Sequence, residues 1–138
     1  LLESPVFTGT PTAPALGIGT NNMRGYQLAV NGKIRALEIK VEAEPWPDYV
    51  FNSKHNLTSL PDLEKFIQQN QHLPNIPSAV QVKKDGINLG EMNAKLLEKI
   101  EELTLYLIQK DKDIAELKES NKRIDELSKK LDQLLNKK

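Results

Sequence analysis

The chain contains no cysteine, so disulfide bonds and cysteine-ligated zinc sites are both excluded. Neither sign of charge is in excess, because 19 Lys plus Arg stand against 19 Asp plus Glu. A neutral chain has no basic field to attract nucleic acid. No apolar run approaches the roughly 18–20 residues that a membrane-spanning helix needs. We therefore expect no nucleic-acid partner and no membrane insertion.

Proline is absent from residues 89–138, and glycine is absent after Gly90. Leucine and isoleucine recur there at spacings of three and four, which predicts a long amphipathic helix of about 75 Å at roughly 1.5 Å per residue. Such a helix cannot bury its own apolar stripe. We therefore expect it to pack against copies of the same chain as a coiled coil.

One heptad frame accounts for most of this helix, with its seam at positions a and d. Lys110 and Asn121 are polar intrusions, each of which lowers stability and can fix register and strand number. Beyond Ile124 a second frame fits better, because Leu127 then falls in the seam and Ser128 leaves it. We therefore expect a phase shift near residues 120–124. The predicted oligomerisation residues are Leu96, Ile100, Leu103, Leu107, Ile114, Leu117, Asn121, Ile124 and Leu131. Isoleucine at a with leucine at d favours a dimer in the simple rules for parallel coils.

Large apolar side chains also lie outside the seam in the first half of the helix, at Leu97, Leu105, Tyr106 and Ile108. A solvated coiled coil would not expose four such side chains in one region. We expect the segment Trp46–Val82, from the same or an adjacent subunit, to cover them. This predicts a compact head around residues 89–108 and a barer stalk after about residue 110.

The first half of the chain predicts extended structure. Residues 1–20 contain Pro5, Pro11 and Pro14, which is typical of an extended linker. Residues 21–43 are interpreted as a shaft segment of strands, in which residues 26–30 and 33–36 flank Asn31-Gly32 in a type I′ hairpin.

Residues 44–88 predict a small irregular head. Trp46, Tyr49 and Phe51 cluster there, and such a cluster is either the core of a small domain or a sugar-binding platform. Ser59 is expected to cap a short helix that ends near Asn70. The prolines of residues 72–78 predict an ordered loop, and residues 79–82 a short strand or turn. Asn88 and Glu91 suit a capping box at the start of the long helix.

No catalytic constellation is apparent in the sequence. His55 and His72 are the only histidines, and neither lies in a metal-binding pattern such as HExxH. No serine lies in a nucleophile-elbow motif. The glycines of residues 17–19 precede no helix that would bind phosphate. We therefore expect a non-enzymatic chain with no metal and no cofactor.

Several longer stretches resemble the C-terminal region of phage tail-fibre-domain proteins, which is related to the intramolecular chaperone domains of endosialidase-type fibres. The resemblance extends over about residues 16–110. Its stretches are LGIGT (16–20), LAVNGKIRA (28–36), WPDYVF (46–51), HLPNIPS (72–78), GINLGEMN (86–93) and LLEKIEELTLY (96–106).

The resemblance implies a homotrimer at the tip of a fibre and outweighs the indication of a dimer from the heptads. The expected fold is α+β and fibrous, and the expected location is a virion or, alternatively, a bacterial surface or an injection system. Because the N-terminus has neither a start methionine nor a signal-peptide pattern, we expect a C-terminal fragment of a longer protein. A host receptor or glycan is the possible further partner. Related chaperones cleave themselves at a Ser-Asp-x-Arg-type junction. Residues 35–38 stand roughly where that junction is expected and read RALE, so we expect the domain to stay attached.

Overall fold

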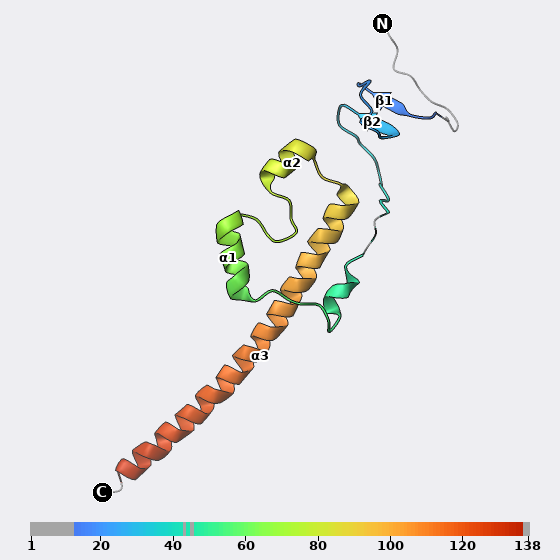
Figure 1. The fold of residues 1–138 in the computed structure, drawn as a ribbon. Helices are drawn as coiled ribbons and strands as arrows, with labels where there is room; N and C mark the ends of the chain where they lie inside the picture. Colours follow the sequence, from blue (N-terminus) through green and yellow to red (C-terminus); the bar gives the residue numbers. More distant parts are fainter. Residues whose placement is uncertain (1–12, 43, 45, 137–138) are drawn as a thin grey trace. The chain divides into compact units, whose positions relative to one another are not determined.

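The computed structural model describes residues 13–42, 44 and 46–136, and the chain divides into two compact units between Lys40 and Val41 (Figure 1). The first unit contains a two-stranded parallel sheet, and the second contains three α-helices, of which the last is long. The predicted combination of short strands, a small head and a long C-terminal helix is confirmed at this level. Most of the predicted linker, residues 1–12, lies outside the described residues.

The sheet of the first unit joins β1 (Leu16–Ile18) to β2 (Leu28–Val30), with Leu16 opposite Leu28. Gly17 is required in β1, because a Cβ atom there would lie 2.3 Å from the carbonyl oxygen of Thr20. The chain reverses between the strands at Arg24 and Gly25, which have φ values of 46° and 84°.

The predicted Asn31-Gly32 hairpin is wrong. Asn31 instead binds the end of β2 to β1. Its backbone amide donates to the carbonyl of Ile18 (2.9 Å), and its side-chain amide donates to the carbonyl of Gly19 (3.3 Å). Residues 33–36, the expected second strand, are not in a strand. A type I′ turn needs positive φ at both central residues. That geometry occurs at Arg24–Gly25, where the amide of Tyr26 donates to the carbonyl of Met23.

The second unit begins with a short 3₁₀ helix, η1 (Asp48–Phe51), and continues with α1 (Leu60–Asn70). The predicted cap of α1 is confirmed, because the Ser59 hydroxyl accepts a hydrogen bond from the amide of Asp62. Gln71 ends α1 in a left-handed conformation with φ of 60°.

Residues 79–82 are not the expected strand or turn but part of a second short helix, α2 (Ala79–Asp85). Ser78 and Gln81 form a full capping box at its start. The head therefore has two short α-helices where one was predicted. Asn88 occupies the N-cap position of the long helix, but neither the side-chain cap nor the capping box predicted there forms, since its side chain donates to Glu91 Oε2 (3.2 Å) and bonds no helix amide.

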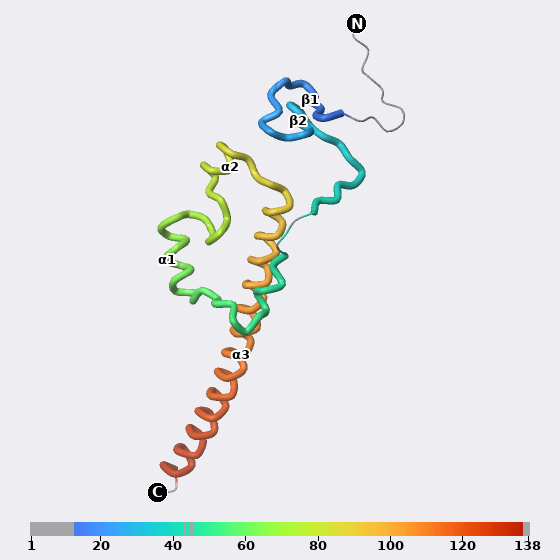
Figure 2. The backbone as a smooth tube through the Cα atoms, turned by 45° about the vertical axis from the view of Figure 1, so that its right-hand side comes forward, coloured from blue at the N-terminus to red at the C-terminus, as the bar shows by residue number. Residues whose placement is uncertain are grey.

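The long helix α3 (Leu89–Leu135) is the element on which the second unit is built. Segment 46–58, which contains η1, runs beside α3, and a loop carrying α1 and α2 returns to the start of α3 (Figures 1 and 2). Pro47 and Val50 are fully buried where η1 meets α3, and Val50 retains 1% of its accessible surface. None of the helices in the described part of the chain is both long and apolar enough to cross a membrane.

Candidate functional site

Two faces of α3 differ sharply in how far they are covered. In the heptad frame, the predicted seam residues from Leu96 to Leu117 are between 48% and 63% exposed. Glu98 and Glu101 lie away from the seam, at positions f and b, and are buried. We call the face of α3 that carries Glu98 and Glu101 its outer face. The chain covers this face and leaves the apolar seam open.

The seam stays open along the stalk as well. Asn121, Ile124 and Leu131 are exposed, and so are Leu127 and Leu134, which the second heptad frame places in the seam. All nine predicted oligomerisation residues therefore present side chains that no other part of the described chain covers.

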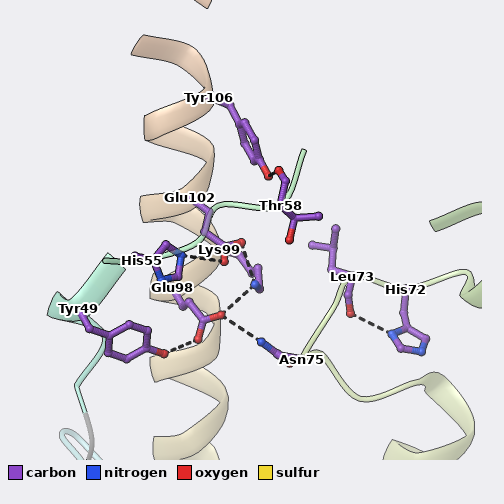
Figure 3. A network of polar contacts seen from close by, with 10 residues as sticks. All are labelled: Tyr49, His55, Thr58, His72, Leu73, Asn75, Glu98, Lys99, Glu102 and Tyr106. Atoms are coloured by element: carbon purple, nitrogen blue, oxygen red, sulfur yellow. Dashed lines mark hydrogen bonds and ion pairs between the residues drawn. The ribbon is translucent and has the colours of Figure 1, made fainter. Parts of the chain in front are cut away.

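Glu98 is the centre of the contacts on the outer face (Figure 3). The Tyr49 hydroxyl donates to Oε2 (2.6 Å), and the Asn75 amide donates to Oε1 (3.3 Å). The Lys99 ammonium donates to the same Oε1 at 2.9 Å. One carboxylate on α3 therefore binds both η1 and the proline-containing loop of residues 72–78.

Lys99 extends this network by donating to Glu102 Oε2 at 2.8 Å. The other oxygen of Glu102 lies 3.7 Å from Nε2 of His55. One turn further along α3, the Tyr106 hydroxyl donates to the carbonyl of Thr58. Hydrogen bonds at Tyr49 and Thr58 therefore attach segment 46–58 to α3, and His55 lies between them, close to Glu102.

The pKa values of the network follow from these bonds. Burial favours the neutral form of Glu98, but hydrogen bonds from Tyr49, Lys99 and Asn75 outweigh it and hold the pKa of Glu98 below its ordinary value. The hydrogen bond to Glu98, with a smaller effect of burial, raises the pKa of Tyr49 to about 12. For Lys99, burial opposes the charge, but bonds to Glu102 and Glu98 raise its pKa. The network is therefore most stable with Glu98 ionised and Tyr49 neutral.

The expectation that segment 46–82 covers the off-seam residues is confirmed in part. Leu97, Leu105 and Tyr106 are half-buried, and the covering contact at Tyr106 comes from Thr58 of the same chain. Ile108 remains 49% exposed. It lines a mainly apolar hollow of about 550 Å³ together with Leu57, Leu60 and Leu105.

The aromatic residues of the head do not form its interior within one chain. Trp46 is 53% exposed and Phe51 58%, while the hydroxyl of Tyr49 is held by Glu98. Pro47 and Val50 are the side chains that η1 buries instead. The three rings are therefore accessible to a ligand or to another subunit.

Comparison of the chain with protein-family models, with curated proteins and with solved structures finds no match. The chemistry of the site is therefore interpreted from its own geometry. Within residues 13–42, 44 and 46–136, no cluster of three or more His, Asp or Glu side chains is arranged to hold a metal ion.

Sequence reasoning missed the Glu98 network. A glutamate and a lysine on a charged helix are usually solvated, and nothing in the spacing distinguishes Glu98 from its neighbours. Asn75 after Pro74 was a signal for a sharp turn in the loop that contacts Glu98. Asparagine tolerates the left-handed conformation that Asn75 adopts here, with φ of 65°. The helix α2 could have been found, since Ser78 and Gln81 match the capping-box spacing.

Proposed function

We propose that the chain is a structural, non-enzymatic tail-fibre module that forms a homotrimer through α3, registers the three chains and caps the fibre at its C-terminal end. The observation that carries this proposal is the open seam of α3. Its apolar side chains continue from Leu96 to Leu134, and solvent is an unfavourable environment for a stripe of that length. Identical helices can cover one another along such a seam.

The position of the head supports this use of α3. Segment 46–58 is hydrogen-bonded to Glu98 and Tyr106, at positions f and g, and His55 approaches Glu102 at position c. A head on that side leaves the a and d positions free for other helices. The heptad pattern by itself favours a dimer, and the resemblance to tail-fibre proteins is the ground for three chains.

The mechanism follows from effective concentration. Association of three helices holds the preceding segments close together, so that extended segments pair in register without slow encounters between free chains. On this proposal α3 acts as an intramolecular chaperone for what precedes it, and the protein belongs to a virion tail fibre or to a comparable assembly on a bacterial surface.

The mass of the full chain in solution tests this proposal, with equilibrium sedimentation as the measurement. We expect a trimer at micromolar concentration. A chain that ends at residue 88 should be monomeric, because it lacks the seam. A stable monomer of the full chain would refute the proposal, and a stable dimer would refute the trimer.

A matched pair of variants locates the interface. Replacing both Ile114 and Leu117 by asparagine removes two seam side chains, whereas replacing Lys112 and Ala115 alters positions f and b of the same turn. We expect the seam variant to associate at least about tenfold more weakly, a loss of about 1.4 kcal/mol, and the control to remain unchanged. Equal effects of the two pairs would contradict an interface at the seam.

Recognition of a receptor or glycan is a second candidate function, and the exposure of Trp46, Tyr49 and Phe51 favours it. Aromatic faces stack against sugar rings while keeping a polar edge in water. Titration of the chain with a set of oligosaccharides, followed by isothermal calorimetry, tests this function. Binding that is lost in Trp46→Ala but kept in Tyr26→Ala would support it.

A further inference from the structure

Two buried polar atoms at the junction of segment 46–58 with α3 have no hydrogen-bond partner. They are Nε2 of His55 and Oε2 of Glu101. His55 is held in place by its own backbone, whose amide donates to the carbonyl of Asn52 at 2.8 Å. A buried polar atom without a partner costs free energy, so the hydrogen bonding of this junction is incomplete.

The charges around His55 are unbalanced. From α3 it approaches Glu102, and Glu102 and Glu98 share the ammonium group of Lys99 (Figure 3). From η1 it faces the ring of Tyr49, with 6.0 Å between ring centroids. The two carboxylates of this partly buried cluster therefore carry one more negative charge than Lys99 neutralises.

The distance between His55 and Glu102 is only slightly longer than a hydrogen bond. Oε1 of Glu102 is not used by Lys99, which bonds Oε2, and it lies 3.7 Å from Nε2 of His55. A charged hydrogen bond between these groups would be about 2.7–2.9 Å long, so a shift of roughly 1 Å makes the bond. The two side chains are only 17% and 20% exposed, which limits screening by solvent.

We propose that His55 is a pH-sensitive latch, whose protonation closes an ion pair with Glu102 and tightens segment 46–58 on the outer face of α3. Protonation places a positive charge 3.7 Å from Glu102 and offsets the excess of negative charge. The head is then held more firmly in mildly acidic solution and more loosely as the pH rises above the range in which histidine carries a proton. This device acts within one chain and does not depend on the oligomeric state.

Hydrogen exchange of the full chain tests the latch. Amide protection in residues 46–58, corrected for the intrinsic rate at each pH, is measured at about pH 5.5 and about pH 7.5, on either side of the ordinary histidine titration near 6.5. We expect about fivefold greater protection at the lower pH, as one partly buried ion pair would give. His55→Gln should lose this dependence.

His72 supplies the matched control, because it is the only other histidine and bonds the carbonyl of Leu73 instead of α3. His72→Gln should keep the full pH dependence of residues 46–58. An unchanged dependence in His55→Gln, or its loss in His72→Gln, would overturn the latch.

A measurement on the unsubstituted chain covers the case in which His55→Gln does not fold. The ring of His55 is titrated by NMR, and the indole resonance of Trp46 and the amides of residues 46–58 are followed together. All should shift with the midpoint of His55, and Glu102→Gln should reduce the shift of the amides. Amides that do not respond at that midpoint would exclude the latch.

Discussion

The hydroxyl of Tyr49 donates a hydrogen bond of 2.6 Å to the carboxylate of Glu98, and so joins η1 to α3 across 49 positions of sequence. Glu98 is almost fully buried, and it also accepts from Asn75 and Lys99. This relationship places the head on the outer face of α3. It also makes the attachment measurable through a tyrosine and a carboxyl group whose pKa values are both displaced.

Replacing Tyr49 by phenylalanine should destabilise the second unit by about 1 kcal/mol, because a buried carboxylate loses one of its donors. The midpoint of unfolding by urea measures this change. Tyr26→Phe is the matched control, since the ring of Tyr26 is exposed and belongs to the first unit. Equal midpoints for the two variants would show that the bond contributes nothing.

Tyr49 should ionise at a higher pH than an ordinary tyrosine. Its pKa of about 12 stands above the ordinary value of 10, so the folded chain retains this proton longer than the unfolded chain. The stability that the group contributes is complete below about pH 10 and is lost as the pH rises toward 12. Absorbance titration of the native chain should therefore show a tyrosine that ionises near pH 12, and Tyr49→Phe should remove it. The pKa of Tyr106 is also raised, so the late ionisation of Tyr106 should still be seen in the Tyr49→Phe variant.

Acid should loosen the head through Glu98. Its pKa is lowered in the folded chain, so its contribution is present above the unfolded value near 4.3 and is lost as the pH falls through the folded value. Glu98→Gln should be less stable at neutral pH and should lose less stability between about pH 6 and about pH 3. Glu116→Gln, on the exposed part of α3, should follow the unsubstituted chain. Parallel pH profiles for all three proteins would contradict this role of Glu98.

The proposed phase shift of the heptads predicts a difference between two neighbouring residues. The second frame places Leu127 in the seam and Ser128 outside it, whereas the first frame places Ser128 in the seam. Leu127→Asn should therefore lower the thermal midpoint of the assembly by several degrees, and Ser128→Asn should leave it nearly unchanged. The reverse order of effects would favour one uninterrupted frame.

Local patterns in the sequence were sufficient where the relevant physics is local. The long helix and the Ser59 cap of α1 depend on side chains within a few residues of one another. The same holds for α2, whose capping-box residues Ser78 and Gln81 were present in the sequence but were not used. The heptad seam is likewise a property of helical periodicity.

The hairpin prediction failed because turn propensity at Asn31-Gly32 competes with contacts from elsewhere in the chain. Leu28–Val30 pairs with Leu16–Ile18. The backbone amide of Asn31 donates to the carbonyl of Ile18, and its side chain donates to the carbonyl of Gly19. A dipeptide signal carries no information about which strand will be the neighbour.

The formation of α3 and its apolar seam can be predicted from the sequence, because both follow from the spacing of side chains along one helix. The face of α3 that the head covers is set by contacts that form only when the chain folds. That choice rests on Glu98, Glu102 and Tyr106 meeting Tyr49, His55 and Thr58, which lie about fifty positions away. Contacts of this kind depend on the path of the chain between the partners, and that path leaves no periodic signal in the sequence.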